Sequence, residues 1–215
     1  MKKALEIYKK IAIRDDIEAI RELIRIYGGR PGFESAKNDR EWIKWQEKAV
    51  ALGDYKIAFQ LGTVLIGDWH LDSVALNVQK GLRLIESAAS RGLDEAQYVY
   101  GTLLLLYDSH SLQSRGDYID INRTRSPGGG EPTEAARYFL TAAKQGHAYA
   151  QFELGKLYRD GHGVPKDYVL AYMWMNIAAA SGSEQSEQNR DELAKHMTRE
   201  QIAEAQRLSR ECKQK

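Results

Sequence analysis

Apolar residues recur at helical spacing in two runs between residues 148 and 182, and a polar, glycine-rich stretch separates the two runs. In the first run Ala150, Leu154 and Tyr158 follow one another every four residues, which places them on one side of an α-helix. Residues 160–165 interrupt this pattern with glycines and a proline, which favour turns and end helices. The second run predicts another helix, and its stripe is Ala171, Trp174, Ala178 and Ala179, followed by Gly182. The segment therefore predicts a helix-turn-helix unit.

The same apolar stripe recurs upstream, each time ahead of a residue that punctuates the pattern. The equivalent stripes are Ala135, Tyr138, Ala142 and Ala143; Gly81, Leu84, Ala88 and Ala89; Trp42, Trp45, Ala49 and Val50; and Ala4, Ile7, Ile11 and Ala12. The punctuating residues Asp15, Gly53, Gly92, Gly146 and Gly182 lie 38, 39, 54 and 36 residues apart. Such periods indicate a solenoid, in which each unit buries its apolar face by stacking on its neighbours.

Three segments of the last unit, residues 151–158, 161–164 and 171–182, carry a family resemblance. They spell Q-x-x-L-G-x-x-Y, G-x-G-V and A-x-x-W-x-x-x-A-A-x-x-G, a pattern that resembles the Sel-one-like repeat, a relative of the tetratricopeptide repeat. The other units match in part, and together the matches cover nearly the whole chain. The resemblance implies an all-α fold, namely a right-handed α-solenoid of stacked helix-turn-helix repeats, which in this family usually serves as an adaptor that holds other proteins.

We expect a single domain over residues 1–215, because a stack of repeats can continue without a boundary. Its predicted parts are a half repeat at 1–15, repeats at 16–53, 54–92, 93–146 and 147–182, an insertion at 108–131, and a C-terminal capping helix pair at 183–215. Thr198 and Gln201 predict a capping box at the start of the last helix. Trp42 and Trp45 are predicted to pack between repeats rather than to form a binding cage.

Charge and composition narrow the choice of partner and compartment. Lysine and arginine number 31 against 30 acidic residues, so the charge balance does not favour nucleic acid or an anionic membrane as a partner. No apolar run approaches the roughly 20 residues that span a bilayer. The single cysteine, Cys212, excludes an internal disulfide framework. Residues 1–15 lack the apolar core of a signal peptide, so we favour an N-terminal capping helix over a start created by removal of an export or lipoprotein segment.

Two polar clusters resemble fragments of metal or catalytic sites. His70 lies between Asp68 and Asp72, but no second histidine follows at the spacing of a zinc motif, so a solvated or capping cluster is favoured. In the insertion, residues 109–111 read Ser-His-Ser, yet adjacency in sequence is not the geometry of a catalytic triad. The sequence therefore predicts no catalytic residue, no metal ion and no cofactor.

Partner-binding positions are expected on the first helix of each repeat, which lines the concave side of tetratricopeptide-like stacks. These positions are Phe59, Thr63 and Ile66, then Tyr98, Thr102 and Leu105, then Phe152, Lys156 and Arg159. The insertion adds His110, Tyr118 and Arg123, because long loops between regular elements are often functional. Packing between repeats is an equally weighted interpretation of the three aromatic positions.

The favoured function is a non-catalytic protein-protein interaction module that acts as a monomer. Resemblance to short Sel-one-like proteins with divergent N-terminal loops points to a bacterial immunity protein that neutralises a secreted toxin effector. A general scaffold in bacterial envelope biogenesis or signalling is the nearest alternative. A hydrolase of cell-wall-type substrates, as implied by cysteine-rich relatives, is the least favoured. The compartment depends on the N-terminus: the periplasm if an export segment was removed, and the cytoplasm otherwise.

Overall fold

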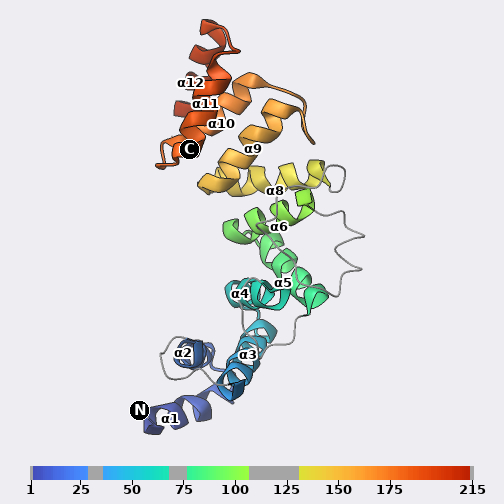
Figure 1. The fold of residues 1–215 in the computed structure, drawn as a ribbon. Coiled ribbons are helices and arrows are strands. Elements are labelled where there is room, and N and C mark those ends of the chain that lie inside the picture. The colour runs from blue at the N-terminus through green and yellow to red at the C-terminus, as the bar shows by residue number, and fades with distance from the viewer. Residues whose placement is uncertain (1, 29–35, 68–76, 107–130, 214–215) are drawn as a thin grey trace. The chain divides into compact units, whose positions relative to one another are not determined.

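The structure is a computed structural model that describes residues 2–28, 36–67, 77–106 and 131–213. Every regular element in these residues is an α-helix, which confirms the all-α fold (Figure 1). In chain order the helices are α1 (Lys2–Ala12), α2 (Ile17–Gly28), α3 (Ala36–Ala51), α4 (Tyr55–Ile66), α5 (Val78–Ser90), α6 (Asp94–Leu106), α8 (Pro132–Lys144), α9 (Ala148–Asp160), α10 (Tyr168–Ala179), α11 (Glu184–Ala194) and α12 (Arg199–Lys213).

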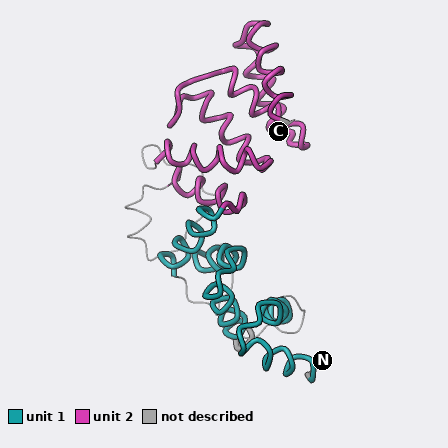
Figure 2. The backbone as a smooth tube through the Cα atoms, turned by 180° about the vertical axis from the view of Figure 1, so that it is seen from behind, with its two compact units in different colours: residues 1–91, 112–122 teal, residues 92–111, 123–215 magenta. Residues whose placement is uncertain are grey.

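These helices form two compact units (Figure 2). Unit 1 contains α1 to α5, and unit 2 contains α6 to α12. Within the units the two helices of each predicted repeat pack on each other, as α2 with α3, α4 with α5, α6 with α8, and α9 with α10. The second helix of one pair also packs on the first helix of the next, as α3 does on α4 and α8 on α9. Each unit is therefore a stack of helical hairpins.

The punctuating residues all adopt the backbone conformation that a helix needs in order to reverse within a few residues. Gly53, Gly92, Gly146 and Gly182 have φ values of 89°, 94°, 95° and 88°. Asp15, which takes the place of glycine in the first turn, has a φ of 64° and is the only non-glycine residue with positive φ among the described residues. This left-handed conformation is readily available to glycine and is tolerated by aspartate. The repeat boundaries predicted from spacing thus coincide with a recurring turn.

Glycines at the middle of the first helices allow the two helices of a pair to touch. A Cβ atom added to Gly155 would lie 2.8 Å from Met175 Cγ and 3.2 Å from the Ala171 carbonyl oxygen. In the same way, a Cβ on Gly101 would lie 2.9 Å from the Phe139 ring. The glycine of the repeat signature is therefore a helix-crossing position.

In three of the four helix pairs the connection closes with the same backbone hydrogen bond, although the connections differ in length. The N–H of the residue before the second helix donates to a carbonyl near the end of the first helix. The bonds are Asn77 to Leu65 (3.0 Å), Glu131 to Leu104 (2.8 Å) and Asp167 to Tyr158 (2.9 Å). The second helix therefore begins at the same place on its partner in all three repeats.

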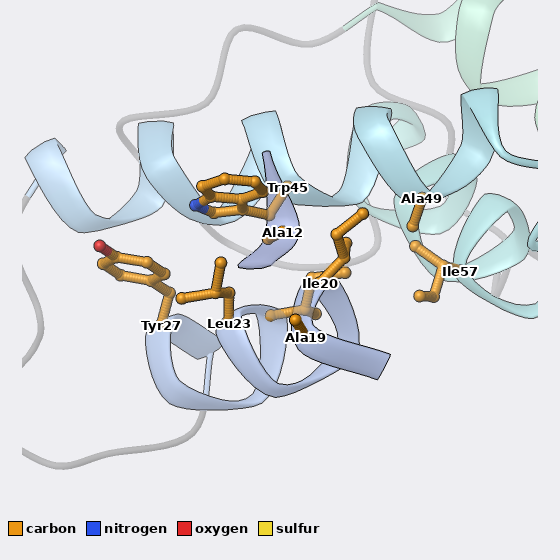
Figure 3. Close-up of a cluster of buried hydrophobic side chains, with 9 residues drawn as sticks. Ala12, Ala19, Ile20, Leu23, Tyr27, Trp45, Ala49 and Ile57 are labelled. Atoms are coloured by element: carbon orange, nitrogen blue, oxygen red, sulfur yellow. The ribbon is translucent and has the colours of Figure 1, made fainter. Parts of the chain in front are cut away.

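The core of unit 1 forms where α2 meets α3 (Figure 3). The indole of Trp45 lies over Leu23 and beside Tyr27, and it is 5% exposed. Ala12 of α1 and Ile57 of α4 join the same cluster, and Trp42 packs against it. These contacts confirm that both tryptophans are packing residues.

Unit 2 ends in the capping helix pair that the sequence predicted. Leu193 of α11 and Ala205 of α12 are buried in a cluster with Met175 and Tyr172 of α10. At the start of α12, the Thr198 N–H donates to Gln201 Oε1 (2.9 Å), and the Gln201 N–H donates to Thr198 Oγ1 (3.2 Å). This reciprocal pair is the predicted capping box.

Candidate protein-binding face

Six of the twelve predicted partner-binding positions lie on α6 and α9 of unit 2. The side chains of Tyr98, Thr102 and Leu105 on α6 are half-buried, as are Lys156 and Arg159 on α9. Phe152, the aromatic residue that matches Tyr98 in the next repeat, is buried. The surface that α6 and α9 offer to a partner is therefore amphipathic.

The predicted positions outside this surface contribute differently. Phe59, Thr63 and Ile66 of α4 are 7%, 6% and 0% exposed, so in unit 1 they fill the interior instead of lining a surface. Phe59 is therefore a packing residue and not part of a binding groove. His110, Tyr118 and Arg123 lie outside the described residues, as do Asp68, His70 and Asp72.

Tyr98 is the centre of an aromatic cluster that links α6 to the start of α9. Its ring stacks on the His147 imidazole with centroids 4.8 Å apart, and it lies 5.9 Å from the Tyr149 ring. Burial and the negative charge of Glu153 raise the pKa of the Tyr98 hydroxyl, so the side chain stays neutral. Tyr149 is 68% exposed and extends the cluster to the surface. We define the cluster of Tyr98, His147 and Tyr149 as the aromatic patch.

His147 holds the patch in place because it also caps α9. Its Nδ1 accepts a hydrogen bond from the Ala150 N–H (3.2 Å), as an N-cap side chain does. Burial lowers the pKa of His147, and the nearby carboxylates of Asp94 and Glu95 oppose that shift only in part. Sequence reasoning missed both His147 and Tyr149, since histidine is not among the usual N-cap residues and a lone tyrosine at a helix start has no periodic signal. One signal could have identified His147 as a cap, namely its position directly after the punctuating Gly146, where the next helix is about to begin.

The two basic residues of α9 are held by neighbouring side chains. Lys156 Nζ pairs with Glu153 at 2.7 Å and lies 5.1 Å from the centre of the Phe152 ring. Arg159 pairs with Asp160 at 2.8 Å and donates to Asn189 Oδ1 of α11 at 3.1 Å. These contacts hold two cationic side chains of α9 in defined positions, which favours recognition over non-specific attraction.

An open depression of about 350 Å³ lies elsewhere in unit 2, at the starts of α10 and α12. Its lining includes Asp167, which caps α10 by accepting the Leu170 N–H at 2.9 Å, and Lys166, whose Nζ lies 4.8 Å from the centre of the Tyr168 ring. Over the described residues, no group of three or more His, Cys, Asp or Glu side chains is arranged to hold a metal ion. None of the described helices is long and apolar enough to cross a membrane.

The helical hairpins, their left-handed turns and their glycine crossings define the class of fold as an α-solenoid of short repeats. More narrowly, residues 58–93, 130–147 and 148–183 match the Sel1 repeat family. These segments are thus similar to the Sel1 repeat, which confirms the resemblance drawn from the sequence, and the Sel1 repeat family suggests a protein-protein interaction module.

Two solved structures resemble the chain over most of its length. One is a protective antigen present in uropathogenic Escherichia coli strains that displays an SLR fold, with 28% identity and a TM-score of 0.70 over 98% of this chain. The other is a Sel1 repeat protein from Oxalobacter formigenes, with 26% identity and a TM-score of 0.60 over 86% of this chain. This chain spans 40% and 47% of their respective lengths, which is less than half of either. A search of curated proteins gave no match.

Proposed function

We propose that this chain is a non-catalytic, monomeric binding protein that takes another protein on the α6 and α9 surface of unit 2. The observation that carries the proposal is the aromatic patch, in which the 68% exposed Tyr149 stands on a support of Tyr98 and His147. A tyrosine fixed in this way loses little conformational entropy on binding and offers both apolar area and a hydroxyl group. Lys156 and Arg159 supply positive charge further along α9.

The partner we propose is a secreted toxin effector, which makes the chain a bacterial immunity protein. An immunity protein acts by occupying a surface of its toxin, so it needs a binding face and no catalytic group of its own. The supports are the Sel1 repeats, the amphipathic α6 and α9 surface and the resemblance of the sequence to short proteins of this layout. The insertion at residues 108–131 would add selectivity, since it connects α6 to α8 next to the proposed surface in the sequence.

The test begins with the genes that neighbour the gene for this chain, among which the proposal predicts a toxin gene. Cells that express the toxin should survive when they also express this chain, and the two purified proteins should form a 1:1 complex. Tyr149→Ala should weaken the complex by about tenfold or more, because a buried aromatic anchor commonly contributes that much to binding. Tyr55→Ala is the matched control, since Tyr55 is an exposed tyrosine near the start of α4 in unit 1.

A second variant separates the role of the insertion from that of the helices. Residues 109–130 are replaced by a short glycine-serine link, and circular dichroism confirms that the helices form. The toxin complex should then be weaker but still present. Undiminished affinity in this variant would exclude the insertion from the site. Full protection by Tyr149→Ala, Tyr98→Ala and Phe152→Ala together would move the site away from α6 and α9, and no protection by the intact chain would refute the immunity proposal.

A further inference from the structure

Two acidic residues, Asp94 and Glu95, lie beside the aromatic patch in the first turn of α6. They precede Tyr98 by four and three residues, so the three side chains are neighbours on the helix surface. Both carboxylates also act on the second ring of the patch. Burial lowers the pKa of His147, and the charges of Asp94 and Glu95 oppose that shift. The patch is therefore bordered by negative charge on its α6 side.

These two carboxylates have no cationic partner among the described residues. The first is half-buried and the second is exposed, and neither forms an ion pair there. The basic residues of α9 do not neutralise them, because Lys156 is paired with Glu153 at 2.7 Å and Arg159 with Asp160 at 2.8 Å. Of the charged side chains on α6 and α9, the carboxylates of α6 are therefore the ones left unpaired.

Acidic side chains in a first helical turn stabilise a helix by themselves, but in three other helices of this chain they also pair with an arginine. The pairs are Glu18 with Arg21 in α2 (2.6 Å), Glu134 with Arg137 in α8 (2.9 Å) and Glu187 with Arg190 in α11 (3.5 Å). In each pair the arginine follows the glutamate by three residues. The residue that follows Glu95 by three is Tyr98, so α6 has an aromatic ring where those helices have a guanidinium group.

One of these pairs shows how a guanidinium group uses a carboxylate and a tyrosine ring together. Arg137 Nη2 donates to Glu134 Oε1 at 2.9 Å, and the guanidinium carbon lies 4.8 Å from the centre of the Tyr138 ring. The planar guanidinium group can stack on a ring and donate to a carboxylate at the same time. The aromatic patch offers the same two groups, and no lysine or arginine of the described residues lies over its rings.

We propose that the aromatic patch and the carboxylates of Asp94 and Glu95 together bind an arginine side chain of the partner protein. Its guanidinium group stacks on Tyr149, whose side chain is 68% exposed, and donates hydrogen bonds to the carboxylates. Lysine fits less well, because its compact ammonium group lacks the planar surface that stacks on a ring. The inference rests on the proposed function, since it names the chemistry that the partner presents at the same surface.

A titration with a short peptide tests the inference without the toxin. The probe is a peptide with a single arginine between two glycines, blocked at both ends, and its matched control carries citrulline, which has nearly the same shape but no charge. Binding to the full-length chain at low ionic strength is followed by NMR of ¹³C-labelled tyrosine rings, and Tyr149→Leu identifies the signal of Tyr149. The arginine peptide should shift this signal saturably and bind about fivefold or more tightly than the citrulline peptide.

Removal of the carboxylates separates the effect of charge from that of the rings. Asp94→Asn/Glu95→Gln should weaken binding of the arginine peptide to the level of the citrulline peptide and leave binding of the citrulline peptide unchanged. Glu184→Gln/Glu187→Gln is the matched control, because it removes two carboxylates from the first turn of α11 in the same unit, and it should bind like wild type. Circular dichroism should show unchanged helix content in both variants, since the new side chains have nearly the same shape.

Equal affinity for the arginine and citrulline peptides would overturn the inference, and so would an equal loss of affinity in the α11 variant. Its failure can be told apart from failure of the proposed function. If the arginine peptide does not bind but the toxin complex is weakened by Tyr149→Ala, the chain binds its toxin through other chemistry. If the arginine peptide binds as expected but the chain gives no protection against the toxin, the arginine site stands and the immunity proposal is refuted.

Discussion

Gln46 occupies a position that apolar side chains hold in the other repeats. It lies seven residues before Gly53, as Ile85, Phe139 and Met175 lie seven residues before their own turn glycines. Gln46 is 0% exposed, and its amide nitrogen and oxygen have no hydrogen-bond partner among the described residues. A buried polar group without a partner is destabilising, because it loses its hydrogen bonds to water on folding and forms none within the protein.

We therefore expect Gln46→Met to stabilise the protein by about 1 to 3 kcal/mol, the usual penalty for burying an unpaired polar group. Urea unfolding monitored by circular dichroism measures the change. Gln151→Met is the matched control, since the Gln151 amide donates to the Ala143 carbonyl at 3.1 Å and its loss should not stabilise. A Gln46→Met protein that is less stable than wild type would show that the amide does have a partner.

Gly155 and Gly146 are required for different reasons. We expect Gly155→Leu to destabilise unit 2 by about 1 to 3 kcal/mol, because the side chain would overpack the crossing of α9 and α10. Gly146→Ala should lower the free energy of unfolding by about 1 to 2 kcal/mol, because the φ of 95° is strained for alanine. Steric overlap does not contribute, since no atom lies within 4 Å of an added Cβ. Thermal melts of the two variants provide the measurement. An unchanged melting temperature for Gly155→Leu would mean that the helices do not cross at that residue.

At the scale of a helix, the cap of α9 makes unit 2 sensitive to acid. The pKa of His147 is lowered in the folded state from its ordinary value of 6.5, so the folded chain binds a proton less readily than the unfolded chain does. Its stabilising contribution is therefore complete above that ordinary value and is lost as the pH falls below it. Protonation also turns Nδ1 from the acceptor of the Ala150 N–H into a donor.

The wild-type melting temperature should consequently fall more than that of His147→Asn when the pH is lowered from about 7.5 to about 5.5. Asparagine is a good N-cap and does not titrate, so it keeps the cap and removes the pH dependence. The difference between the two proteins isolates His147 from the other four histidines of the chain. Parallel pH dependence in both proteins would contradict this assignment.

The helices themselves were predictable because their signals are local and repeated. The stripe before each punctuating residue located the second helices, and the glycines of the first helices in the last three repeats lie at the helix crossings. The side chains at the surface were less predictable. Helical spacing alone gave Phe59, Tyr98 and Phe152 the same role, yet Phe59 and Phe152 are buried while Tyr98 is half-buried. The exposure of each aromatic residue depends on the side chains that the next repeat places against it. For Tyr98 these side chains are His147 and Tyr149.

At the scale of the whole molecule, we expect the chain to unfold as a single cooperative domain. In a solenoid each repeat is stabilised by contact with its neighbours, so the loss of one exposes the next. Differential scanning calorimetry should show one transition, and Gln46→Met in unit 1 and Gly155→Leu in unit 2 should each shift the whole of it. Two transitions that respond separately to the two variants would instead establish two domains that unfold independently.

The backbone bonds made by Asn77, Glu131 and Asp167 have a consequence for how such a gene can change. Since α5, α8 and α10 are each anchored by the residue that precedes them, codons added or lost in frame within the preceding connection leave every downstream helix in the same pairing. The turns at Gly53, Gly92 and Gly146 offer no such freedom, because their few residues set the step from one repeat to the next. An epitope tag or a foreign recognition sequence should therefore be accepted between Gly67 and Asn77 and rejected at Gly92, and the same asymmetry would let natural selection exchange specificities while keeping the scaffold.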